Sequence, residues 1–105
     1  MFNYLIETQE EFGHGTHGYI KCAERARQAA VTQPDAAVAH GLLAALAEDF
    51  IDRNERMAVT SADTEAARGQ FAQAITVLEN AYASADAAAI LAALNRVAAT
   101  RYQQD

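Results

Sequence analysis

The chain has 105 residues, and hydrophobic residue types make up 51% of it. Alanine supplies 26 of these positions, whereas Val, Ile, Leu and Phe together supply only 21. A chain of this length corresponds to about one domain, so we expect a single helical domain over residues 1–105. Because alanine is the best helix former but brings little area to bury, the composition favours an all-α protein with a thin core and disfavours a β-sandwich or barrel.

The charge balance is acidic, with 14 Asp and Glu against 8 Lys and Arg, giving a formal net charge of −6. This charge repels phosphate, and the chain has no run of basic residues, so we expect no direct nucleic-acid binding and no membrane binding. A protein partner with a basic surface matches the charge better. The single cysteine, Cys22, and the absence of a leader pattern in residues 1–7 predict a cytoplasmic protein.

The elements can be predicted in chain order from apolar spacing and from glycine and proline positions. A short helix is expected over residues 3–12, with a strand over 2–6 as the alternative, and a glycine- and histidine-rich loop follows at 13–16. Further helices are expected over about 17–31, 35–57, 62–83 and 86–102. Short connections make neighbouring helices antiparallel, which predicts four to five helices as an antiparallel bundle or as stacked helical hairpins.

Cap signals and the placement of large side chains refine this prediction. Pro34 and Asp35 suit the first turn of a helix, and Thr60 with Asp63 matches a capping box. The large apolar residues fall on single stripes of the last three helices, which include Val38 and Phe50 in the first of them and Phe71, Ile75 and Leu78 in the second. The helix at 17–31 carries mostly alanine and tyrosine. We therefore expect that helix and the loop before it to be the least anchored part of the molecule, where a partner, a second subunit or a ligand supplies contacts.

Residues 13–18, Gly-His-Gly-Thr-His-Gly, satisfy the G-x-G-x-x-G pattern of dinucleotide-binding folds. In those folds the motif follows a strand and further parallel strands come after it. Here the chain continues into alanine-rich helices, so we expect an interhelical turn and no bound cofactor. An anion resting on the N-terminus of the next helix is the other possibility.

Two histidines in the same loop, His14 and His17, are the candidate metal ligands, with Glu10, Glu11 and Cys22 nearby. Imidazole, thiolate and carboxylate groups are the ligand types of zinc and related divalent metals. No H-x-x-x-H or C-x-x-C pair accompanies them, so an exposed polar loop is the simpler interpretation. A metal or small-ligand site at His14 and His17 is the alternative.

A third histidine, His40, lies in residues 39–44, Ala-His-Gly-Leu-Leu-Ala, on a predicted helix. This segment resembles the phosphoacceptor motif of histidine phosphotransfer domains, which are acidic four-helix proteins of similar length. The family has Lys three residues and Gly four residues after the histidine, where this chain has Leu43 and Ala44. The resemblance implies phosphotransfer at His40, whereas the residues favour a histidine at the edge of the apolar face, hydrogen-bonded or half-exposed.

Three acids, Glu48, Asp52 and Glu55, align at helical spacing and form a carboxylate stripe. Carboxylates so arranged could do acid–base chemistry or bind a hard cation, although a solvated helix face is the ordinary interpretation. Acids near a helix C-terminus oppose the helix dipole, and Arg53 and Arg56 offset only part of their repulsion. The stripe is therefore the candidate docking face for a basic partner.

Residues 69–81 carry a pattern of small and large side chains that resembles the second helix of a tetratricopeptide repeat. The matching positions are Gly69, Phe71, Ala74, Leu78 and Ala81, and residues 17–34 echo the frame 52 residues earlier. The resemblance implies packed helical hairpins that present a groove to a peptide or helix.

Taken together, these patterns predict a small acidic helical protein that binds another protein and is not an enzyme. An adaptor, a regulatory inhibitor and an immunity-type protein each fit the size and charge. Because a thin core gains area by association, a homodimer is also possible.

Overall fold

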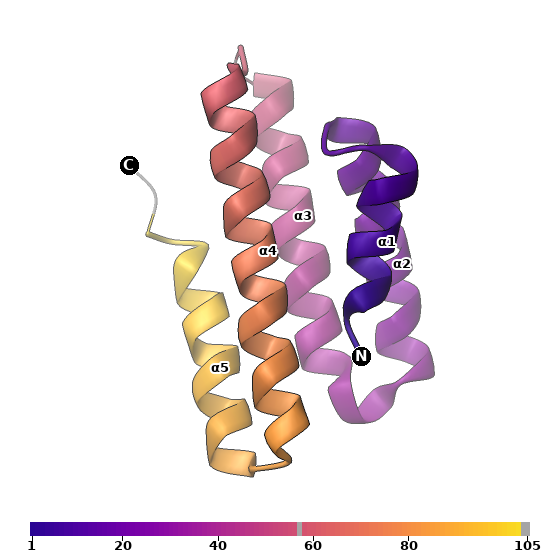
Figure 1. Cartoon of the computed structure of the whole chain (residues 1–105), viewed down its shortest axis with the longest axis vertical. Helices are drawn as coiled ribbons and strands as arrows, with labels where there is room; N and C mark the ends of the chain where they lie inside the picture. The colour runs from indigo at the N-terminus through magenta and orange to yellow at the C-terminus, as the bar shows by residue number, and fades with distance from the viewer. Residues whose placement is uncertain (57, 104–105) are drawn as a thin grey trace.

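The computed structural model describes residues 1–56 and 58–103 of the chain. These residues form α-helices and one 3-10 turn: α1 (Asn3–Phe12), α2 (Thr16–Thr32), η1 (Pro34–Ala36), α3 (Ala37–Arg56), α4 (Ser61–Ser84) and α5 (Ala87–Thr100). Consecutive helices run in opposite directions along the long axis of the molecule (Figure 1). Within the two described ranges no strand is present, so the prediction of an all-α protein with antiparallel helices is confirmed.

The helix ends lie within two residues of the predicted ranges, apart from the predicted end at Met57, which lies outside the described residues. The alternative strand over residues 2–6 is wrong, because α1 begins at Asn3. At the start of α4 the Asp63 N–H donates to Thr60 Oγ1 at 3.1 Å, and the Thr60 N–H donates to the Asp63 carboxylate at 3.2 Å. This reciprocal pair is the predicted capping box.

The helices pack in two groups. α2 lies along α3 and α1 covers α2, whereas α4 lies against α3 and α5 contacts both α4 and α3 (Figure 1). Three aromatic rings join the groups: Tyr19 of α2 lies 5.1 Å from Phe50 of α3 and 5.5 Å from Phe71 of α4. All three side chains are buried, so this cluster forms the centre of the core.

The expectation that the helix at 17–31 is the least anchored part is wrong. Five of its residues in one stripe are buried: Tyr19, Cys22, Ala23, Ala26 and Ala29. Alanines allow α2 and α3 to approach closely, so small side chains reach full burial there. The helix that buries least is α5, where only Ala93 and Val97 are buried and Leu91 stays 60% exposed.

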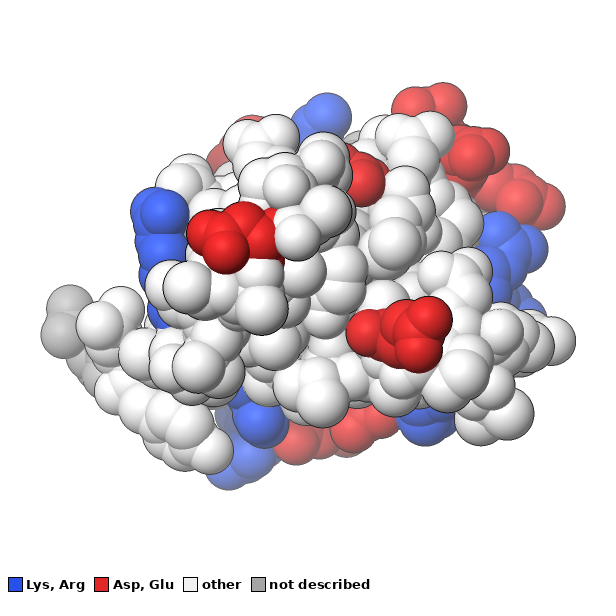
Figure 2. Space-filling model, turned by 90° about the horizontal axis from the view of Figure 1, so that it is seen from below, with Lys and Arg blue, Asp and Glu red and all other residues white. Residues whose placement is uncertain are grey.

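Over the part of the chain that the structure describes, no helix has both the length and the apolar character needed to cross a bilayer. Seen from the end that carries the α4–α5 turn, most of the surface is uncharged, and several acidic side chains lie together at the upper right of the view (Figure 2). The basic side chains form no broad patch on this face.

Candidate docking groove

A groove lies between α4 and α5, on the side of the molecule farthest from α1 and α2. It has a volume of about 630 Å³, within the range of pockets that hold small ligands and short peptide segments. Its apolar floor is formed by Ala74, Val77 and Val97. The remaining lining residues are small or polar: Gly69, Gln70, Gln73, Arg96, Ala99, Thr100 and Gln103.

Small residues of both helices line the groove, at positions where larger side chains would fill the space. A Cβ built on Gly69 would meet no atom within 4 Å, so this position of α4 opens directly onto free space. Ala99 lines the same groove from α5 and is exposed. α5 is therefore held to α4 along one edge, through Val97 and Ala93, and the other edge stays open.

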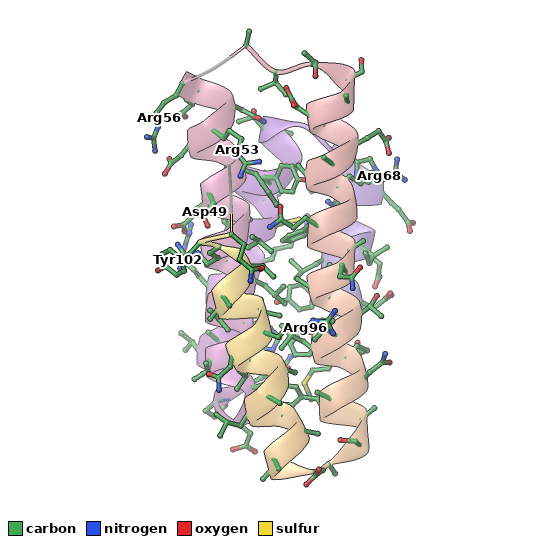
Figure 3. All side chains as sticks on the ribbon, turned by 90° about the vertical axis from the view of Figure 1, so that its left-hand side faces the viewer. Asp49, Arg53, Arg56, Arg68, Arg96 and Tyr102 are labelled. Atoms are coloured by element: carbon green, nitrogen blue, oxygen red, sulfur yellow. The ribbon has the colours of Figure 1, made fainter. Side chains whose placement is uncertain are left out.

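Of the described residues that line the groove, Arg96 alone is charged, and Figure 3 places it between α4 and α5. Six of the other seven basic side chains lie within 4.0 Å of an acid: Lys21, Arg25, Arg27, Arg56, Arg68 and Arg101. The seventh, Arg53, lies over the Phe50 ring. Across the described residues, Arg96 has neither a hydrogen bond nor an ion pair.

The chemistry available in the groove is binding chemistry. A guanidinium group donates hydrogen bonds in a planar fork that matches a carboxylate, and the glutamine amides can both donate and accept. Among the described residues, the lining includes no histidine, cysteine or carboxylate that could act as a nucleophile or as a general base. The arrangement can therefore hold a ligand that is partly apolar and partly anionic.

The three acids of the predicted stripe lie on α3, away from the groove. Glu48, Asp52 and Glu55 are exposed on α3, but Glu48 forms an ion pair with Arg27 of α2, and Asp52 lies 3.9 Å from Arg56. Two of the three carboxylates are thus next to a guanidinium, which reduces the local negative charge. The stripe as a docking face stays a prediction.

The two loop histidines are placed separately from other potential ligands. The His17 ring meets Phe12 edge-on at 5.4 Å, and the half-buried His14 has no hydrogen-bond partner for Nδ1 among the described residues. Over the same residues, no group of three or more His, Cys, Asp or Glu side chains is arranged to hold a metal ion. Burial raises the pKa of the Cys22 thiol to about 11, which disfavours the thiolate that a metal needs. A metal at His14 and His17 stays a prediction.

The glycines of the G-x-G-x-x-G pattern close the turn between α1 and α2. Gly13 has φ +92°, a backbone conformation that side chains other than glycine rarely adopt. A Cβ on Gly18 would lie 2.0 Å from the Gly13 carbonyl oxygen, so only glycine fits this contact. Because a helix precedes the motif instead of a strand, its glycines have the role of an interhelical turn.

His40 is fully buried and is held from both sides. Its Nδ1 lies 2.7 Å from the Tyr4 hydroxyl, and its Nε2 lies 3.1 Å from the Gln33 side-chain oxygen. The ring of Phe2 covers it at a centroid distance of 4.9 Å. Burial lowers the pKa of His40, so the neutral imidazole is favoured. Both ring nitrogens of this buried side chain thus lie within hydrogen-bond distance of a neighbouring side chain.

No protein family, no curated protein and no solved structure matches the chain. The resemblances to tetratricopeptide repeats and to histidine phosphotransfer domains therefore stay predictions. In α4 the matching residues Phe71, Ala74, Leu78 and Ala81 are buried, and Gly69 lines the groove.

Sequence reasoning missed Arg96 and the glutamines around it. A signal was present, because residues 69–100 contain only three charged residues, Glu79, Asp86 and Arg96. A stretch so poor in charge on a helical hairpin is typical of an interface. Arg96 is the one basic residue in this stretch, so the sequence could have indicated it as a contact residue.

Proposed function

We propose that the protein is a protein-interaction module that binds its partner through the outer surface of the α4–α5 hairpin. One observation carries the proposal: eleven of the fourteen residues of α5 are hydrophobic, yet only Ala93 and Val97 are buried. Leu91 is 60% exposed, and Tyr102, just after the helix, is 81% exposed. An exposed, largely apolar helix beside a groove is typical of an interaction site in soluble proteins. An adaptor, a regulatory inhibitor or an immunity-type protein could each use it.

The overall charge and the hairpin serve different steps of binding. The net charge of −6 attracts a partner that is basic overall, and the exposed Glu48, Asp52 and Glu55 contribute to this long-range field. The ion pairs of Glu48 and Asp52 weaken the stripe as an anchor, so the lasting contacts come from α5. Association should therefore slow as salt concentration rises, while dissociation changes little.

The proposal is tested by comparing proteins captured from the native source by the wild type, by Leu91→Ser and by Val38→Ser. Val38 of α3 is 63% exposed, so it matches Leu91 in exposure but lies outside the hairpin. Recovery of the specific partner should fall about tenfold with Leu91→Ser and stay unchanged with Val38→Ser. A partner that both variants recover as well as the wild type would refute the hairpin as the docking surface.

The same surface could be covered by a second copy of the chain. Sedimentation equilibrium over micromolar concentrations distinguishes this case, because a dimer formed through α5 should dissociate in the Leu91→Ser variant and persist in Val38→Ser. A wild-type protein that stays monomeric assigns the surface to a different protein.

A further inference from the structure

We infer that the groove between α4 and α5 takes an amphipathic helical segment of the partner, with an apolar side chain on the groove floor and a carboxylate paired with Arg96. The inference rests on the proposed function and names the chemistry of its contact.

The first step is charge. The chain has almost twice as many acids as bases, and among the described residues at least six of the eight basic side chains have an acid within 4.0 Å. Arg96 has none among the described residues, and no acid lines the groove beside it. A carboxylate arriving from a partner therefore breaks no existing ion pair, and the guanidinium can bind both of its oxygens. Charge complementarity assigns an acidic residue to this end of the groove.

The second step is the floor. Ala74 and Val97 are buried, and Val77 is half-buried beside them, so an occupant meets a short apolar surface. Gln70 and Gln73 border it from α4 and can satisfy polar groups at the rim of a bound segment. The groove thus matches one apolar side chain together with one acid, which is more specific than a uniform hydrophobic face.

The third step is length. The lining residues run from Gly69 to Val77 on α4 and from Arg96 to Thr100 on α5, and Gln103 follows the end of α5. At 1.5 Å per residue the α4 wall is about 12 Å long, which is about two turns of a helix, and the α5 wall is about 6 Å long. On a helix, residues four apart lie on one face about 6 Å apart, so a leucine and a glutamate at that spacing can reach the floor and Arg96 together. Gly69 and Ala99 leave room for the backbone of such a helix to approach.

The experiment titrates the isotope-labelled full chain with three synthetic amphipathic helical peptides and records backbone amide shifts. The peptides are identical except at the position one turn from a central leucine, where they carry Glu, Gln or Lys. The Glu peptide should shift the amides of Gly69, Val77 and Thr100 and bind about fivefold more tightly than the Lys peptide, the range of an exposed ion pair. Sodium hexanoate, which offers a carboxylate and an alkyl chain without a helix, is titrated in parallel.

Two variants with matched controls separate charge from shape. Arg96→Gln should remove the difference between the Glu and Lys peptides, while Arg68→Gln, an exposed arginine of α4 outside the groove lining, should preserve it. Gly69→Leu should block all three peptides by filling the groove. Gly41→Leu, at an exposed α3 position that is equally open, should leave binding unchanged.

Three results would overturn the inference. Equal affinity of the Glu, Gln and Lys peptides refutes the carboxylate assignment, and hexanoate binding as tightly as the Glu peptide refutes the helix. Shifts of the same amides on raising the concentration of the protein alone assign the groove to a second copy. If one of these results is obtained but Leu91→Ser still loses the partner in the capture experiment, only the inference about the groove fails and the proposed function stands. If Leu91→Ser captures the partner as well as the wild type does, the proposed function itself fails.

Discussion

In α2 and α3 alanines line the contact between the helices, whereas in α5 most alanines lie on the surface of the molecule. Both regions contain alanine, which favours helix, although α2 carries four charged residues and α5 carries one. They differ in what lies beside them: α2 faces α3 along its length, while the outer side of α5 faces no other helix of the chain (Figure 1). An alanine-rich helix is thus a core element or a docking surface according to whether a second helix covers it.

The regions also differ in how polar groups hold them. In the N-terminal half the Thr8 hydroxyl donates to the Tyr4 carbonyl at 2.6 Å and accepts from Arg25 at 2.9 Å, and His40 is bonded on both ring nitrogens. Just after α5, the Arg101 guanidinium donates to the Asp49 carboxylate of α3 at 2.8 and 3.1 Å. The polar bonds of the first region involve the buried Thr8 and His40, whereas the two bonds of Arg101 lie at the half-exposed end of α5, so we expect α5 to open more readily than α2.

The largest expected difference between the two regions is in the effect of truncating one large side chain in each of them. Phe50→Ala removes a buried ring of the aromatic cluster and should lower the free energy of unfolding by about 3–5 kcal/mol. Leu91→Ala removes an exposed side chain and should change it by less than about 0.5 kcal/mol. Urea denaturation of both variants measures the difference. Similar losses would show that α5 belongs to the core.

A second comparison uses two glycines of the same turn. Gly18→Ala forces a Cβ against the Gly13 carbonyl oxygen and should lower the free energy of unfolding by about 1–3 kcal/mol. Gly15→Ala adds a Cβ in open space and serves as the control, with little expected effect. Thermal unfolding of the two variants gives the result. Equal stability would contradict the close approach of α1 and α2 at this turn.

The buried histidine should make the N-terminal half sensitive to pH. Because burial lowers the pKa of His40 in the folded state, the unfolded state binds more protons once the pH falls below about 6.5. The free energy of unfolding should therefore decrease from there down to the lowered pKa, by at most about 1.4 kcal/mol per pH unit.

Urea denaturation between about pH 7.5 and 5.5 gives the slope of the free energy of unfolding against pH. This slope separates the protonation of His40 from a loss of stability that is the same at every pH. His40→Gln should flatten the slope even if it lowers stability at every pH. A slope that His40→Gln does not change would show that other groups cause it.

The smallest expected effect concerns the ion pair between Arg101 and Asp49 at the end of α5. Arg101→Ala removes a half-exposed bidentate ion pair and should lower the free energy of unfolding by about 1 kcal/mol or less. Its local effect is more informative, because amide hydrogen exchange should accelerate in α5 and stay unchanged in α2. Uniform acceleration over both helices would show that the hairpin and the N-terminal half open as one unit.

Sequence patterns predicted the helices well and their inward faces less well. In α4 the expected inward residues Phe71, Ile75 and Leu78 are buried. In α3 the expected stripe included Val38, which is 63% exposed, while His40 at the supposed edge is fully buried. The apolar stripe of α3 is broad because alanine is common on every side, so the periodicity could not show which part of it α2 would cover.

The candidate site was harder to predict than the fold. Arg96 matters because it has no ion-pair partner among the described residues, and the partners of the other bases are often far away in sequence. Arg101 and Asp49 are 52 residues apart, and Arg27 and Glu48 are 21 apart. A search for neighbours at helical spacing finds only pairs such as Asp52 with Arg56, so it could not show which cation remains unpaired.

By itself, the sequence determined the all-α class, the helix ends and the acidic surface. Each depends on local physics: alanine favours helix, Thr60 and Asp63 cap α4 within three residues, and charges are counted without coordinates. Tertiary structure alone decided which helix stays uncovered, where His40 lies and which arginine faces an open groove. Those outcomes depend on contacts between residues distant in the chain, whose energies become definite only once the helices have packed.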